Sequence, residues 1–141
     1  KSRRNMRMGY YDALRMLYGL EGKIYYIEQT QEECYYLKRL IGISSEVMGE
    51  LLAEHKRESG LDLREYLERF LPQIAAELKL GSDWSYKTLY LTMLEASARM
   101  LRIGKYRVYT VEELETNVRK KAQGQEGVQE LPAFVRVILN R

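Results

Sequence analysis

Several residue types on which common sites depend are scarce in this sequence. There is one cysteine, Cys34, one histidine, His55, and two prolines among 141 residues. A single cysteine cannot form an internal disulfide, and one cysteine with one histidine cannot complete a four-ligand structural zinc site. A reducing compartment suits such a chain, so we expect a cytoplasmic protein that holds no metal.

The sequence also lacks long apolar runs and phosphate-binding loops. No apolar stretch approaches the roughly 20 residues that cross a bilayer, and neither familiar type of glycine-rich phosphate loop is present. We therefore predict no membrane partner and no cofactor.

Catalytic groups are equally few. A histidine base would have to be His55, which lies among charged neighbours in AEHKRES and is expected to be exposed. Cys34 lies on an apolar stripe without a cationic neighbour to activate it, so we expect a buried, inert thiol. We predict no catalytic residues and a protein that is not an enzyme. A helical enzyme would need a cluster of buried carboxylates, which spacing alone does not reveal.

What is present is a strong helical pattern. Apolar residues recur at three- and four-residue steps through most of the chain. We predict an all-α fold with a single helical domain over residues 1–141, a compact bundle of five to seven helices with one short extended segment near residues 105–109. The first residue is lysine, which leaves open a fragment or internal product of a longer protein.

Glycines, prolines and capping residues predict the helix limits. Helical stripes over residues 24–41 and 84–103 are expected to end at Gly42 and Gly104. Pro72 should kink a helix or start one, and Thr110 with Glu113 resembles a capping box. The segment ELPAFVRVILNR at residues 130–141 is expected to be a short helix or strand.

Charge is unevenly distributed along the chain. Residues 1–27 hold six cations and two anions (+4), residues 28–80 seven and eleven (−4), and residues 81–121 eight and five (+3). Such asymmetry is typical of a face that meets an acidic polymer, and equally of two parts of one fold that attract each other.

The densest cationic cluster is RMLRIGKYRVYT at residues 99–110. Its cations are Arg99, Arg102, Lys105 and Arg107. They can contact a phosphate backbone, or they can be ordinary residues of a helix end that pair with Glu112, Glu113 or Glu115. The nucleic-acid interpretation requires further cations to join them in space, and the candidates are Arg3, Arg4, Arg7, Arg119, Lys120 and Lys121.

Tyrosine is the most unusual component of the composition. There are twelve tyrosines, and seven of them fall within the first 36 residues. Their rings can form the rim of a core, a protein interface or a platform for nucleobases. Tyr11, Tyr18 and Tyr25 recur every seven residues, and we predict that this row is a seam for a protein partner.

The basic stretches SRRNMR and RMLRIGKYR, on an otherwise helical chain without an initiator methionine, resemble the small all-helical subunits of CRISPR effector complexes. The resemblance covers the general character of the whole chain, and no motif carries it. It implies a non-catalytic subunit in antiviral defence whose cations hold guide RNA or displaced DNA without reading bases.

The sequence thus favours a non-catalytic helical subunit that binds a nucleic-acid backbone, RNA or single-stranded DNA, within a larger complex. The alternative is a helical adaptor that docks on another protein through its tyrosine-rich first third. Other protein subunits are expected as partners, and self-association is open.

Overall fold

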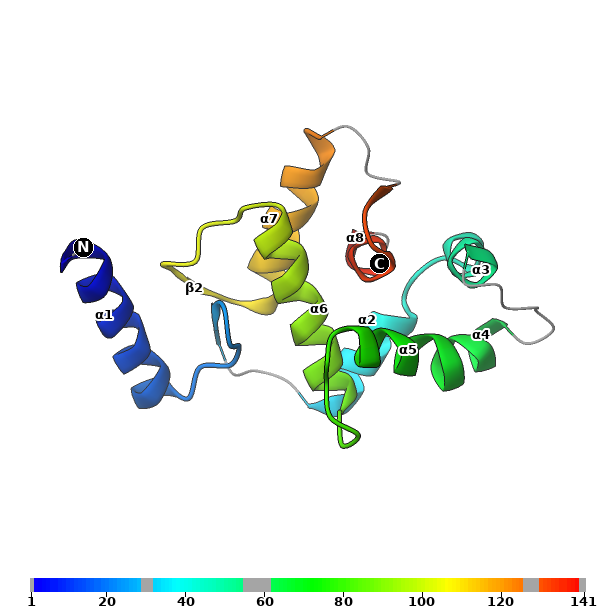
Figure 1. Cartoon of the computed structure of the whole chain (residues 1–141), viewed down its shortest axis with the longest axis horizontal. Helices are drawn as coiled ribbons and strands as arrows, with labels where there is room; N and C mark the ends of the chain where they lie inside the picture. Colours follow the sequence, from blue (N-terminus) through cyan, green and yellow to red (C-terminus); the bar gives the residue numbers. More distant parts are fainter. Residues whose placement is uncertain (1, 29–31, 55–61, 126–129, 140–141) are drawn as a thin grey trace.

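The computed structural model describes residues 2–28, 32–54, 62–125 and 130–139, and helices dominate it (Figure 1). In chain order the elements are α1 (Ser2–Tyr18), β1 (Tyr26–Ile27), α2 (Glu33–Ile41), α3 (Ser45–Glu54), α4 (Asp62–Glu65), the π-helical turn η1 (Tyr66–Phe70), α5 (Leu71–Glu77), α6 (Tyr86–Met100), β2 (Val108–Tyr109), α7 (Val111–Gln123) and α8 (Ala133–Leu139). Because α4, η1 and α5 run on without a break, these described residues form seven helical rods. The prediction of five to seven helices with an extended segment near residues 105–109 is confirmed.

Helix α6 is the centre of the core, as its broad apolar stripe predicts. Its side chains Leu89, Leu94 and Ala98 are fully buried, and it packs against α2, α7 and α8. The hydroxyl of Ser85 caps its start by accepting a hydrogen bond from the backbone N–H of Thr88. The helix ends at Met100, where Arg102 takes a positive φ of 59°. The predicted end at Gly104 is therefore wrong by about one turn.

The region around Pro72 forms one continuous rod with a π-helical turn directly before the proline. The backbone N–H of Leu71 donates to the carbonyl of Tyr66, five residues back. Proline has no N–H and its ring crowds the preceding turn, so the wider π turn accommodates it at the start of α5.

A short strand, β1, replaces the first part of the helix predicted over residues 24–41. In β1, Tyr26 and Ile27 pair in parallel with Val108 and Tyr109 of β2, and Glu21 bridges to Ile27 on the other side. A parallel pair needs a long connection, and residues far along the chain supply its second strand. The helix predicted over residues 24–41 therefore begins only at Glu33, as α2.

Helix α7 begins as its sequence predicts. The side chain of Thr110 accepts from the N–H of Glu113, and the carboxylate of Glu113 accepts from the N–H of Thr110. The last segment forms a helix, α8, with Val137 and Ile138 fully buried.

Cys34 is exposed in the first turn of α2, so the prediction of a buried thiol is wrong. The buried side of that helix is formed by Tyr36 and Leu40 instead. His55 lies outside the described residues.

Helix α1 stands at one end of the molecule, with β1, β2 and the loop before β2 between it and the central helices (Figure 1). Gly19 follows it with a φ of 63°. Within the described residues, no helix combines the length and the apolar character needed to cross a membrane.

Candidate nucleic-acid interface

A cleft of about 470 Å³ lies between the inner side of α1, the loop before β1 and the end of α6. This volume falls within the usual range for ligand sites. Four cations line the cleft, with Asp12 as the one acid among its lining residues: Arg15, Lys23, Arg99 and Lys105. We call it the basic cleft. Its cations come from three separate segments of the chain, which the fold brings together.

Lys23 is held at the cleft by a loop that wraps around a buried carboxylate. Glu95, on the core helix α6, is only 5% exposed. It accepts hydrogen bonds from the backbone N–H groups of Lys23 at 3.0 and 3.1 Å, Ile24 at 2.7 Å and Tyr25 at 2.7 Å. These bonds satisfy the carboxylate and leave the Lys23 side chain exposed.

Gly22 makes this loop possible. Its φ is +93°, and a Cβ atom there would lie 2.5 Å from the carbonyl oxygen of Tyr25 and 2.9 Å from Oε2 of Glu95. Only glycine fits so close an approach of backbone to carboxylate.

Arg15 attaches α1 to the rest of the protein. Its Nη2 donates to the carbonyl of Tyr25 at 3.1 Å, and its guanidinium lies 4.3 Å from the ring centroid of Tyr26. Asp12 lies 3.7 Å from Nη1 of Arg15 and accepts a 3.0 Å hydrogen bond from the Tyr26 hydroxyl. Burial, and then this bond to Asp12, raise the pKa of Tyr26. Arg15 is thus mainly a structural wall of the cleft.

The other three cations carry charge that no acid in the described part of the chain balances. The side chains of Lys23, Arg99 and Lys105 form no ion pair or hydrogen bond with any described residue. Lys23 and Arg99 are exposed, and Lys105 is half-buried. Since a carboxylate pair would already compensate such groups, their unpaired state favours an anionic ligand.

Tyrosine rings lie along the same side of the molecule. The ring of Tyr11 is 5.2 Å from that of Tyr26 and 5.9 Å from that of Tyr106. Arg7 and Lys105 lie 5.9 and 5.4 Å from the Tyr106 centroid. Cations therefore alternate with aromatic rings here, which is the composition of single-strand binding surfaces.

Of the cations predicted to bind nucleic acid, some lie at or beside the basic cleft and others do not. Arg99 and Lys105 line the basic cleft, Arg7 reaches Tyr106 beside it, and Arg102 is exposed just past α6. Arg107 pairs with Glu113 at 2.7 Å, which is the helix-end alternative considered from the sequence. The side chains of Arg3 and Arg4, in the first turn of α1, lie outside the described set.

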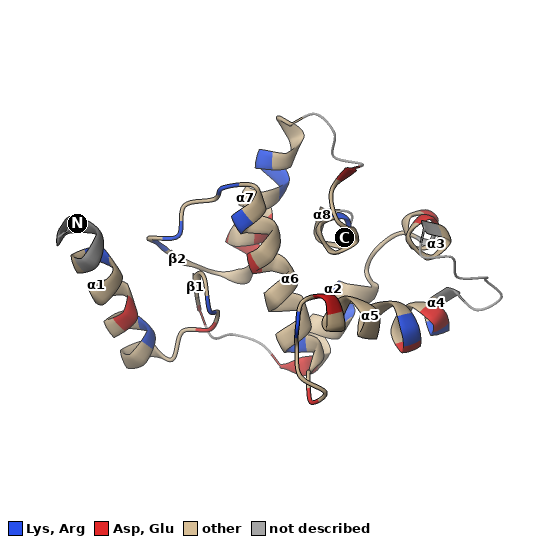
Figure 2. Ribbon diagram, in the orientation of Figure 1, with Lys and Arg blue, Asp and Glu red and all other residues tan. Residues whose placement is uncertain are grey.

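The cations at the end of α7 are not brought to the cleft. Figure 2 shows them at the end of α7 that points away from β2. Lys120 and Lys121 are exposed there, and Arg119 is half-buried. Arg119, Lys120 and Lys121 are not among the residues that line the basic cleft, so their assignment as nucleic-acid-binding residues stays a prediction.

The three tyrosines predicted as one seam are also separated. Tyr18 is 70% exposed at the end of α1, Tyr11 faces Tyr26, and Tyr25 is 2% exposed in the core. Because α1 ends at Tyr18, Tyr25 is not on the same helix. The seven-residue row is therefore not a helical seam.

Sequence reasoning missed Arg15 and Lys23. The available signal was Glu95, an acid between Leu91 and Ala98 on the apolar stripe of the longest predicted helix. A carboxylate in that position needs partners, and a glycine-containing loop such as GLEGKIYY can supply them.

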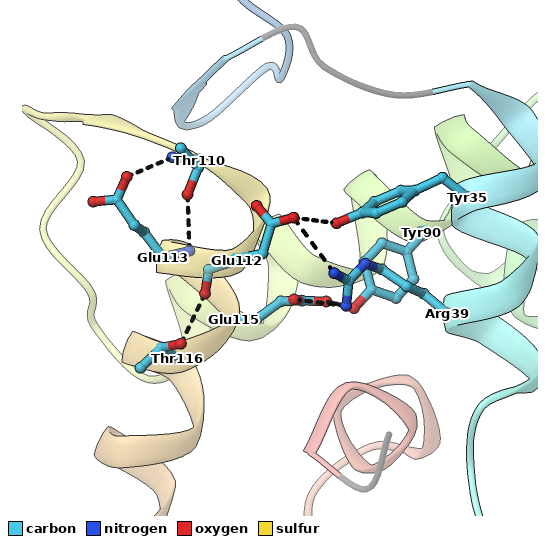
Figure 3. Close-up of polar contacts among 8 residues, drawn as sticks. All are labelled: Tyr35, Arg39, Tyr90, Thr110, Glu112, Glu113, Glu115 and Thr116. Carbon is cyan, nitrogen blue, oxygen red and sulfur yellow. Dashed lines mark hydrogen bonds and ion pairs between the residues drawn. The ribbon is translucent and has the colours of Figure 1, made fainter.

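A second polar cluster joins α2, α6 and α7 (Figure 3). Glu115 is 1% exposed, lies 3.0 Å from Nη1 of Arg39 and accepts a short hydrogen bond from the Tyr90 hydroxyl. Glu112 accepts from the Tyr35 hydroxyl at 2.5 Å and lies 3.5 Å from Nη2 of Arg39. We call these five residues the Arg39 network.

The Arg39 network is a structural joint. Burial alone would lower the pKa of Arg39, but Glu115 and the Tyr35 hydroxyl raise it. Burial, followed by the bond to Glu112, raises the pKa of Tyr35 to about 12. Each buried acid, Glu95 or Glu115, already binds N–H or O–H donors of the protein. In the described ranges, no group of three or more metal-ligating side chains is placed to hold an ion.

Comparison with protein-family models, curated proteins and solved structures found no match for this chain.

Proposed function

We propose that the basic cleft binds the phosphate backbone of single-stranded nucleic acid without reading its bases. The observation that carries the proposal is a set of three cations, Lys23, Arg99 and Lys105, which come from two distant parts of the chain and have no ion-pair partner among the described residues. Phosphates would lie against these cations, and unstacked bases would contact the neighbouring tyrosine rings.

The ligand follows from this composition. A phosphate backbone needs positive charge, and the tyrosines favour a single strand, whose base faces are free to stack. The cleft itself presents few groups for the hydrogen-bond pattern of a particular base, so binding would be sequence-independent. The resemblance to small CRISPR subunits remains a prediction, and it implies the same class of ligand.

Salt-dependent binding tests the proposal. Fluorescence anisotropy would measure the affinity for labelled oligonucleotides of about 16 nucleotides, the upper end of common site sizes. If three phosphates are neutralised, log K should fall with log salt at a slope of about −2. RNA, single-stranded DNA and duplex DNA form separate arms, with both single strands binding more tightly than the duplex.

A pair of matched variants separates a local site from general charge. Arg99→Glu with Lys105→Glu should weaken binding more than about tenfold and flatten the salt slope. Lys120→Glu with Lys121→Glu changes the net charge equally, at the far end of α7, and should weaken binding less than about threefold. Equal losses in both variants, or binding that salt does not affect, would contradict the proposal.

The exposed side of α1 favours a protein partner as a second function. Met6, Tyr10 and Leu17, which lie at helical spacing on the side of α1 opposite Arg15, are 72%, 61% and 76% exposed, which agrees with the adaptor alternative. This side faces away from the basic cleft, so one function does not exclude the other.

A further inference from the structure

The basic cleft concentrates positive charge in a small space. Among the described residues, the side chains of Lys23, Arg99 and Lys105 have no acidic partner, and Asp12 lies beside Arg15 instead. These three cations border a space of about 470 Å³. An internal phosphodiester carries a single negative charge, so a short internal stretch of strand in this volume would leave part of the positive charge unbalanced.

The interior of the cleft offers little surface on which a base can stack. Tyr25 and Tyr26 line it, but they are only 2% and 4% exposed. Their hydroxyl groups are already bound, because Tyr25 donates to the carbonyl of Ile103 at 2.6 Å and Tyr26 donates to Asp12 at 3.0 Å. Since bases bind single-strand proteins through open aromatic faces, the interior is suited to a phosphate group rather than to a base.

We propose that the basic cleft binds the phosphorylated end of a single strand, which is a phosphate monoester on the terminal nucleotide. This inference rests on the proposed function and names the part of the strand that occupies the cleft. A phosphate monoester carries a charge of about −1.5 to −2 at pH 7 and presents three strong acceptor oxygens. An internal phosphodiester has less charge and fewer free oxygens.

The cations match a phosphate monoester in number and in origin. Lys23 lies in the loop before β1, Arg99 in the last turn of α6, and Lys105 between α6 and β2. Because they border one cleft from different segments, each can donate to a different oxygen of the monoester. A charge-assisted hydrogen bond is roughly twice as strong as a neutral one, so the additional charge of the monoester raises the affinity.

The tyrosine rings beside the cleft provide a place for the rest of the strand. The half-buried rings of Tyr11 and Tyr106 lie 5.9 Å apart, and the ammonium group of Lys105 lies 5.4 Å from the centroid of Tyr106. Lys105 thus connects the cleft to this pair of rings, where the bases that follow the terminal phosphate can stack. A nucleoside monophosphate lacks these further nucleotides, so a strand is the better ligand.

Competition with matched oligonucleotides of about eight residues, measured by fluorescence anisotropy, tests the inference. They would carry a 5′-phosphate, a 3′-phosphate, either phosphate blocked as a methyl ester, or hydroxyl groups at both ends. We expect a phosphate at one of the two ends to raise the affinity more than about fivefold, and its methyl ester to lose most of this gain because the ester has less charge. A nucleoside monophosphate should compete at least about tenfold less well than the phosphorylated strand.

A pair of variants assigns the gain in affinity to the cleft. Lys23→Gln removes one cation and keeps the backbone N–H that binds Glu95, so it should reduce the gain from the terminal phosphate to less than about twofold. Lys79→Gln removes the same charge from an exposed position just past α5 and should leave the gain unchanged.

The outcomes separate this inference from the proposed function. Salt-dependent binding without a gain from a phosphate at either end overturns the inference and leaves the proposed function standing. A gain that the methyl ester retains in full, equal reductions by Lys23→Gln and Lys79→Gln, or a nucleoside monophosphate that competes as well as the phosphorylated strand also overturns the inference alone. Absence of any salt-dependent binding overturns both.

Discussion

Two arginines lie over tyrosine rings at nearly the same distance, yet their surroundings differ. Arg15 is 4.3 Å from the centroid of Tyr26, and Arg39 is 4.4 Å from that of Tyr35. Arg39 also meets Glu112 and Glu115, so its charge is balanced twice. Arg15 has Asp12 at 3.7 Å, and further cations line the cleft beside it. The pair of Arg39 with Tyr35 belongs to the closed Arg39 network, whereas the pair of Arg15 with Tyr26 belongs to the wall of the open basic cleft.

The difference comes from where the acids lie. The first turns of α7 carry Glu112, Glu113 and Glu115, which suit the positive end of the helix dipole and bind Arg39, Arg107 and Tyr35. The side of α1 that faces the cleft carries Asp12. Local charge balance therefore distinguishes a stabilising arginine such as Arg39 from a cleft cation such as Arg99, which is available to a ligand, and net charge along the sequence does not.

The largest effect on stability is expected when the Arg39 network loses its buried acid, Glu115. Glu115→Ala leaves the guanidinium of Arg39 partly buried and opposite only Glu112, so the free energy of unfolding should fall by about 3–5 kcal/mol. Urea denaturation followed by circular dichroism measures it.

Glu112→Ala is the matched control on the same helix. The Glu112 side chain is 55% exposed, so its pair with Arg39 is screened by water and its loss should cost less than about 1 kcal/mol. Similar losses in both variants would show that burial does not set the strength of the Arg39 network.

Local signals in the sequence predicted the helices and their caps well. The stripe of α6 and the capping box of Thr110 with Glu113 depend on residues a few positions apart, so periodicity reveals them. The extended segment near residues 105–109 was visible locally, but its pairing with Tyr26 joins residues 82 positions apart, and nothing local to either segment indicates that pairing.

The candidate site was only partly predictable for the same reason. Arg99 and Lys105 were visible as a dense local cluster, whereas Lys23 joins them only because Glu95 holds its loop against α6. Conversely, Lys120 and Lys121 looked similar to Arg99 in the sequence, but they are not among the residues that line the cleft.

The next largest effect is expected at Glu95, the carboxylate that holds the loop beside the basic cleft. Glu95→Ala removes the acceptor for three backbone N–H groups of residues 23–25, and unfolding free energy should fall by about 2–3 kcal/mol. Because Lys23 then loses its fixed position, affinity for single-stranded nucleic acid should fall in the same variant. Urea denaturation and anisotropy measure the two changes.

Glu77→Ala provides the comparison for Glu95→Ala. Glu77 is exposed on α5 and accepts a 3.4 Å hydrogen bond from Gln73, so its removal should change stability by less than about 0.5 kcal/mol. A Glu95→Ala variant that is as stable as Glu77→Ala would mean that the loop does not depend on this carboxylate.

The smallest effect concerns the pH range in which Tyr35 of the Arg39 network contributes to stability. The pKa of Tyr35 is raised from 10.0 to about 12, chiefly by burial and then by its bond to Glu112. A raised pKa means that folding favours the neutral phenol, so this contribution is complete below pH 10 and is lost as pH rises toward about 12. Tyr35→Phe cannot ionise, so its stability should fall less steeply than that of the wild type across this interval. Denaturation at several pH values measures both slopes, and parallel slopes would show that Tyr35 ionises as readily in the folded chain as in the unfolded one.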